Sequence, residues 1–281
     1  MFPARASLRA LLGAETAATP PGTGCVIGMV HLRPLPGTPR WGGRMDEVVN
    51  AALADAEALR AGGADAVLVE NHGDVPFSPG RVDPGTVAGM AVAIAAIRRA
   101  VDLPLGVNVL KSDALAALAL AAATGARFVR VNIHVGAAVT DQGLIQGSAH
   151  ESLRYRRLLA SDVALLADVQ AKHGTPLAPV PLEQEARDCV SRALADGLVV
   201  SGMATGEATE LGDLKRVRGA VPGVPIVVGS GATADTAAEL LELADGIIVG
   251  TSIKRDGVLA NPVDVSRVRR VVEAARGGRA R

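Results

Sequence analysis

Two short segments near the C-terminus have the composition of a phosphate-binding site. Residues 227–233 have the sequence Val-Val-Gly-Ser-Gly-Ala-Thr, and residues 247–252 have the sequence Ile-Ile-Val-Gly-Thr-Ser. Each is an apolar strand that runs into a turn of glycine and hydroxyl residues. Where two such turns end neighbouring parallel strands, their backbone N–H groups can form a cup for a phosphate. We therefore expect a phosphorylated ligand, held by Gly229, Ser230, Gly231, Gly250, Thr251 and Ser252.

The same residues allow another interpretation of the turns and one addition to the cup. The glycines could simply permit tight turns, which is the commonest use of glycine. Lys254 follows the second turn and could add a positive charge to the cup, although a lysine at the start of a helix is more often solvated.

Polar residues at the ends of other apolar segments form a second group of candidates. A polar side chain inside a buried strand is costly unless it is hydrogen-bonded, so these residues need partners. A structural network would satisfy that need, but convergence on one end of a barrel favours a catalytic site. The predicted catalytic residues are His31, Glu70, Asn108, Asn132, Asp168 and Lys172.

The lysines among the polar residues suggest specific chemistry. A buried amine with a lowered pKa can form a Schiff base or contact phosphate, and Lys172 and Lys111 are the candidates. Asp168 could position Lys172 or His173, or act as a general base. For Lys111 we favour a surface lysine.

The sequence offers little support for a metal or for a serine or cysteine nucleophile. No histidine and cysteine spacing matches a zinc site, and no Gly-x-Ser-x-Gly elbow is present. Binding of Mg²⁺ through Glu70 and Asp168 is a weak alternative, so no metal ligand or other cofactor is predicted.

The secondary-structure elements that would position these residues form a repeating pattern. Eight apolar segments alternate with helical ones, which predicts a parallel sheet closed into a (β/α)8 TIM barrel. The predicted strands are Cys25–His31, Ala66–Glu70, Leu105–Leu110, Phe128–Ile133, Val163–Val169, Gly197–Val200, Ile226–Gly229 and Gly246–Gly250. The predicted helices include Met45–Ala61, Thr86–Ala100, Asp113–Thr124 and Leu182–Ala195. An open doubly wound sheet is less favoured, because no Gly-x-Gly-x-x-Gly follows the first strand.

We expect one domain over residues 1–281. Residues 1–24 form an N-terminal cap with a short helix on the barrel floor, and residues 274–281 form a frayed tail. Two loops are candidate lids: a stiff Pro-rich one at Arg33–Arg40, before Trp41, and a Gly-rich, mobile one at Val135–Gly147.

Composition restricts the partners and the compartment. Lys plus Arg and Asp plus Glu both number 29, so bulk charge recruits neither nucleic acid nor an anionic membrane. The apolar stretch at Ala114–Ala123 is too short to cross a bilayer. Cys25 and Cys189 are far apart in apolar settings, which is typical of reduced thiols in a cytoplasmic protein. A homo-oligomer is left open.

Several segments of the sequence together resemble the motifs of one protein family. They are Ile27–Leu32 with Pro34–Gly37, Val69–Phe77, Gly106–Leu110, Arg130–Asn132, Lys172-His173, Thr205-Gly206, Val228–Gly231 and Val249–Lys254 with Asp256-Gly257. The chain is similar to the BtpA/SgcQ family from about the first strand to Val268. The resemblance implies a ribulose-phosphate-binding type of barrel; one branch is associated with photosystem I biogenesis at thylakoid membranes, and another lies among sugar-metabolism proteins. The family pattern has Arg-Asn where this chain has Lys111-Ser112.

Two functional hypotheses follow. In the first, the protein is an enzyme acting on a phosphorylated sugar or nucleoside, by isomerisation, aldol-type cleavage or glycosidic-bond cleavage. In the second, which the resemblance suggests, it is a non-catalytic assembly factor for a membrane complex of the photosystem I type. The second would require a broad exposed apolar or basic face, which the low aromatic content and balanced charge do not predict.

Overall fold

The computed structural model describes residues 6–14, 24–159, 161–171, 173–202 and 209–277. Its central element is a closed barrel of parallel strands in the order β1-β11-β10-β9-β7-β4-β3-β2. The strands are β1 (Cys25–His31), β2 (Ala66–Glu70), β3 (Leu105–Asn108), β4 (Phe128–Val131), β7 (Ala164–Val169), β9 (Gly197–Val200), β10 (Ile226–Val228) and β11 (Gly246–Val249). The predicted TIM barrel is confirmed, and its strands end at most two residues from the predicted positions.

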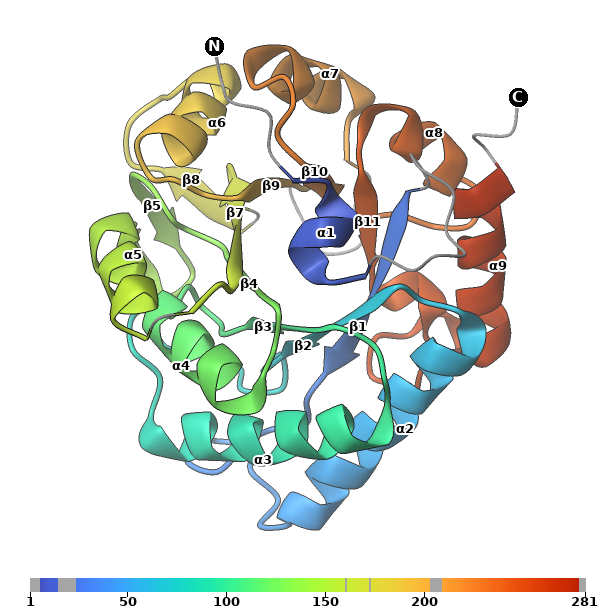
Figure 1. Ribbon diagram of the computed structural model, residues 1–281. Helices are drawn as coiled ribbons and strands as arrows, with labels where there is room; N and C mark the ends of the chain where they lie inside the picture. The colour runs from blue at the N-terminus through green and yellow to red at the C-terminus, as the bar shows by residue number, and fades with distance from the viewer. Residues whose placement is uncertain (1–5, 15–23, 160, 172, 203–208, 278–281) are drawn as a thin grey trace.

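Helices surround the barrel and cover its outer face (Figure 1). They are α2 (Met45–Gly62), α3 (Pro84–Ala100), α4 (Ala114–Thr124), α5 (Ala149–Leu158), α6 (Leu182–Ser191), α7 (Leu211–Ala220), α8 (Ala237–Leu243) and α9 (Val265–Gly277). Two 3-10 turns, η1 (Thr251–Ile253) and η2 (Arg255–Gly257), precede α9. Because the helices bury the outer face and side chains fill the inner one, the strands are apolar along almost their whole length.

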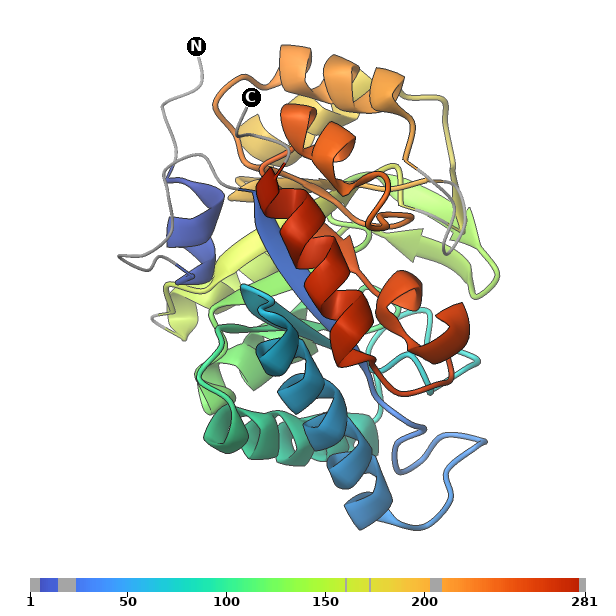
Figure 2. The ribbon, with the colours of Figure 1, turned by 90° about the vertical axis from the view of Figure 1, so that its right-hand side faces the viewer.

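One end of the barrel is closed by α1 (Leu8–Leu12), which lies across its centre in Figure 1 and at one end in Figure 2. Leu8 and Leu12 are almost fully buried and pack with Ile27 and Phe128 in the barrel interior. The polar strand ends lie at the opposite end, which we call the mouth.

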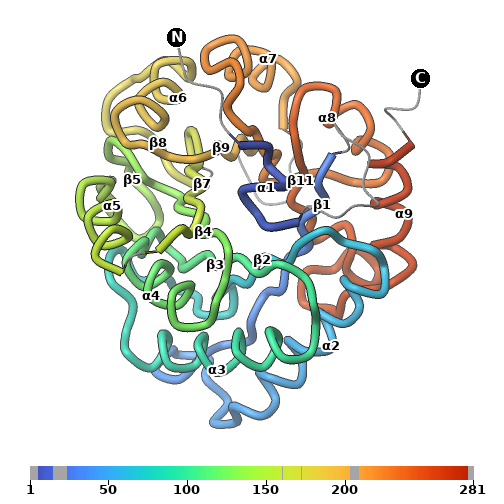
Figure 3. Tube along the Cα trace, in the orientation of Figure 1, coloured from blue at the N-terminus to red at the C-terminus, as the bar shows by residue number. Residues whose placement is uncertain are grey.

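The last helix, α9, closes the helical ring, where it packs beside α2 and α8 (Figure 3). The predicted frayed tail at 274–281 is wrong for its first part, because α9 continues through Gly277. Residues 278–281 lie outside the described residues. No helix in the described ranges is long and apolar enough to cross a membrane.

A small antiparallel sheet beside the mouth was not predicted. It has the order β6-β5-β8, from β5 (Ala137–Thr140), β6 (Gly143–Gln146) and β8 (Gly174–Pro176). The predicted mobile loop after the fourth barrel strand is therefore an ordered hairpin. The reason is packing, because Ala138 and Ile145 are buried against Ile133 and Ala171.

Candidate functional site

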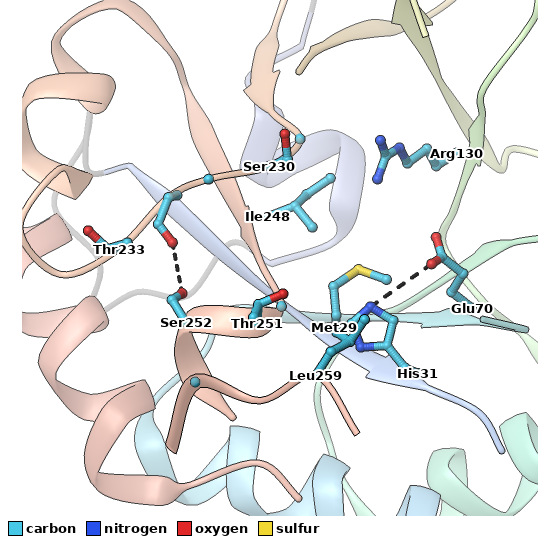
Figure 4. Close-up of a pocket in the computed structure, with 15 residues that line it drawn as sticks. Met29, His31, Glu70, Arg130, Ser230, Thr233, Ile248, Thr251, Ser252 and Leu259 are labelled. Atoms are coloured by element: carbon cyan, nitrogen blue, oxygen red, sulfur yellow. Dashed lines mark hydrogen bonds and ion pairs between the residues drawn. The ribbon is translucent and has the colours of Figure 1, made fainter. Parts of the chain in front are cut away.

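A cavity of about 210 Å³ opens at the barrel mouth (Figure 4). The turns after β10 and β11 line one side of it, through Gly229–Thr233 and Gly250–Ser252. His31 from β1, Glu70 from β2 and Arg130 from β4 line it as well. The cavity therefore joins the six residues of the phosphate cup to two of the predicted catalytic residues.

The cup itself is built from backbone. Gly231 has φ +74°, a left-handed conformation that favours glycine. The N–H groups of Gly231, Ala232, Thr251 and Ser252 donate to no other group in the described part of the chain. The Ser252 hydroxyl donates to the Ala232 carbonyl at 2.8 Å and so ties the two turns together. These N–H groups remain available for an anion.

His31 and Glu70 lie next to each other on the neighbouring strands β1 and β2. The His31 Nε2 is 4.0 Å from the Glu70 Oε1, and both side chains are largely buried. The His72 ring contacts His31 edge-on, with centroids 5.0 Å apart. An imidazole beside a carboxylate can donate or accept a proton at a bound ligand.

A buried polar network lies behind the cavity and presents Arg130 to it. The Arg130 Nε and Nη2 each donate to Asp168 at 2.8 Å, forming a bidentate ion pair. The Asn132 amide also donates to Asp168 at 3.1 Å, and the Asn108 amide donates to the Asn132 oxygen at 3.1 Å. Asn108, Asn132 and Asp168 thus form one hydrogen-bonded group, the structural network that the sequence left open as an alternative.

This network changes the interpretation of Asp168. With a guanidinium and an amide on its oxygens, Asp168 neutralises and positions Arg130, rather than serving as a free base or as the partner of His173. Lys172, the other proposed partner, lies outside the described residues. Glu70 and Asp168, the weak Mg²⁺ candidates, contact His31 and Arg130 respectively. No group of three or more metal-ligating side chains occurs among the described residues.

Arg130 lines the cavity but was not among the predicted site residues. Its signal was an arginine in the middle of the apolar strand β4. Gly229 makes room for it, because a Cβ at that position would lie 3.1 Å from the Arg130 Nη2 and 2.3 Å from the Ser201 Oγ. The glycine turn therefore also allows the guanidinium to approach the cup.

The other two candidate lysines, Lys111 and Lys254, differ from their predictions. Lys111 is only 6% exposed, so it is not a surface lysine. Its Nζ donates to the His173 carbonyl at 3.3 Å, and burial lowers the pKa of the amine. Lys254 is neither a phosphate ligand nor solvated, because its Nζ lies 2.5 Å from the Asp55 Oδ2 in a buried ion pair.

Comparison with known proteins identifies relatives over most of the chain. The sequence model of the BtpA family matches residues 23–277. The photosystem I biogenesis protein BtpA of Synechocystis is 47% identical, over 90% of this chain and 88% of its own length. An uncharacterized protein of Thermococcus kodakarensis is 49% identical, over 89% and 95%. The sgc region protein SgcQ of Escherichia coli is 35% identical, over 95% and 96%.

Solved structures share the fold at low sequence identity. A structure described as native KDPGal superposes with a TM-score of 0.59 at 13% identity, over 94% of this chain and 98% of that one. Phosphoribosyl anthranilate isomerase from Thermus thermophilus gives 0.52 at 14%, over 89% and 97%. These similarities establish the barrel alone.

Proposed function

The chain belongs to the BtpA family, and we propose that it is an enzyme acting on a phosphorylated sugar or nucleoside at the barrel mouth. One observation carries the proposal: a single cavity is lined both by the cup after β10 and β11 and by the pair His31 and Glu70. A ligand whose phosphate occupies the cup would extend toward a proton-transfer pair.

The proposed roles follow from the side chains. The cup binds the phosphate through the backbone N–H groups of Gly231, Ala232, Thr251 and Ser252. Gly229, whose N–H donates to the Val200 carbonyl, leaves room for Arg130 beside the cup. His31 and Glu70 transfer a proton. Arg130, held by Asp168, stabilises negative charge that develops on an oxygen of the ligand. Asn108 and Asn132 position Asp168 and do not contact the ligand. Isomerisation, aldol-type cleavage and glycosidic-bond cleavage all use such a set.

A thermal-shift screen tests the binding step. We would measure unfolding of the protein with inorganic phosphate, pentose and hexose phosphates, and nucleotides. A ligand at about a hundred times its Kd stabilises the folded state by about 2.7 kcal/mol. Gly231→Asp should abolish the shift, because a carboxylate in the cup repels phosphate.

The matched control is Gly223→Asp. Gly223 also has a positive φ, +79°, but no atom lies within 4 Å of its added Cβ, and it does not line the cavity. This variant should retain the ligand shift. If no phosphorylated compound shifts the parent protein, the phosphate cup is wrong.

Catalysis needs its own measurement. The ligand found in the screen would be incubated with the protein and its conversion followed by NMR. Glu70→Gln should bind that ligand and fail to convert it. If the parent protein binds the ligand but does not convert it, the enzyme proposal is wrong and the chain is a binding protein.

A second candidate function is assembly of a membrane complex, because one relative is named a photosystem I biogenesis protein. One surface feature favours it: Val139 and Leu144 lie opposite each other on β5 and β6 and are 49% and 48% exposed. This apolar pair was not expected from the sequence. The test is binding to purified photosystem I. If Leu144→Ser weakens this binding and Gly231→Asp leaves it unchanged, assembly is favoured over the enzyme.

A further inference from the structure

A second cavity, of about 610 Å³, adjoins the first at the barrel mouth. His31 and Leu259 line both cavities, so these two side chains lie at the boundary between them. Ala51 and Ala54 of α2 form part of its lining, together with Pro34. Most of its surface is apolar, which suits a carbon skeleton.

The walls of the second cavity are fixed by buried hydrogen bonds. On one side, the Leu35 N–H donates to the Asp74 Oδ1 at 2.8 Å, which pins the loop after β1 to the loop after β2. On the other side, Asp55 binds the Lys254 amine and accepts from the Val263 N–H at 2.7 Å. The site is therefore formed before a ligand arrives.

Positive charge is concentrated at this cavity. Arg33 and Arg40 line it, and both are exposed to solvent at its rim. The Arg33 Nη1 is 3.8 Å from a Glu47 oxygen, whereas Arg40 forms no ion pair with any described residue. The Asp55 carboxylate inside the cavity is balanced by Lys254. Glu47 offsets part of the Arg33 charge, so the excess positive charge is mainly that of Arg40. Both guanidinium groups have the geometry that matches phosphate and carboxylate.

We infer that the ligand runs from the cup past His31 into the second cavity, where Arg33 and Arg40 bind a second anionic group on it. This inference rests on the proposed function, since the first phosphate lies in the cup. It narrows the substrate class to phosphorylated compounds with a phosphate or carboxylate at their other end. The reacting centre then lies between the two anionic ends, beside His31 and Glu70.

Calorimetric titration of three probes tests the inference. Ribose 5-phosphate carries one anionic group, ribulose 1,5-bisphosphate carries two phosphates, and 6-phosphogluconate carries a phosphate and a carboxylate. At one ionic strength, at least one doubly anionic probe should bind about tenfold more tightly than the monophosphate. The tighter of the two identifies the second group as phosphate or carboxylate.

Variants locate the second group. Arg40→Ala should remove the tenfold gain and leave the affinity for ribose 5-phosphate unchanged, and Arg33→Ala should reduce the gain. Arg60→Ala is the control, because Arg60 is exposed at the end of α2 and lines neither cavity. All three sites are at the surface, so the variants should fold.

Three results would overturn the inference. Equal affinity for all three probes would mean that no second anion site exists. A loss of affinity for all three in Arg40→Ala would mean that Arg40 acts on the first phosphate or on overall charge. No binding of any of the three probes would overturn the inference, and the cup would be rejected as well if the thermal-shift screen finds no phosphorylated ligand. Monophosphate binding that depends on Gly231 would leave the proposed function intact.

Discussion

The bidentate pair of Arg130 and Asp168 is the residue-level feature on which the site depends most. Both side chains are at most 3% exposed, so neither charge is solvated by bulk water. Removing one partner of such a pair leaves the other as an uncompensated buried charge.

We expect Asp168→Asn to lower the free energy of unfolding by about 3–5 kcal/mol, because the amide cannot balance the Arg130 guanidinium. Urea denaturation measures this loss. Combining it with Arg130→Met should recover part of the stability, since no charge then remains buried. A loss below about 1 kcal/mol in the single variant would contradict the desolvated pair.

At the residue scale, the sequence predicted which residues line the cavity better than it predicted which side chains bond to each other. His31, Glu70 and the two glycine turns line one cavity, as their positions at strand ends suggested. The pairing of Asp168 with Arg130 depends on the register of β4 against β7, in which Val131 lies opposite Ala167. Register is set by packing of the whole barrel, so it cannot be obtained from either strand alone.

At the scale of elements, the loop after β1 is held by close contact with the loop after β2. A Cβ on Gly73 would lie 2.5 Å from the Pro34 nitrogen and 2.7 Å from the Leu32 oxygen. Both obstacles are backbone atoms, which cannot rotate away as a side chain does.

Gly73→Ala should therefore displace the loop after β1 and destabilise the protein by about 1–3 kcal/mol. Gly80→Ala is the matched control, because no atom lies within 4 Å of its added Cβ and its stability should be nearly unchanged. Thermal unfolding of the two variants makes the comparison. Equal midpoints would contradict the tight approach of the two loops.

The elements that sequence analysis missed are those with little sequence signal. The barrel strands were predicted because each is a buried apolar run between helices. The strands β5, β6 and β8 have three or four residues each, and β6 and β8 contain glycine or proline. The sheet is completed by the pairing of β5 with β8, more than 30 residues along the chain. Their order comes from long-range pairing, which local patterns do not encode.

At the scale of the whole molecule, α1 closes the barrel at the end opposite the mouth. Leu12 is fully buried among side chains of the barrel interior. Truncating it leaves a cavity at the base of the core.

Leu12→Ala should cost about 2–5 kcal/mol of unfolding free energy. Leu158→Ala is the matched control, because the Leu158 side chain is 79% exposed. This variant should lose less than about 0.5 kcal/mol of unfolding free energy. Chemical denaturation of both variants measures the difference. A small loss in Leu12→Ala would mean that α1 contributes little to the barrel core.

The ion pair of Asp55 and Lys254 joins residues that are 199 positions apart. During synthesis on a ribosome, α2 emerges long before its partner, and the second cavity lacks a wall until Lys254 has been translated. Ligand capture should therefore begin only after the segment that carries Lys254 has folded against α2. A messenger truncated after the codon for Val249 would yield a product without half of the cup and without this cavity wall.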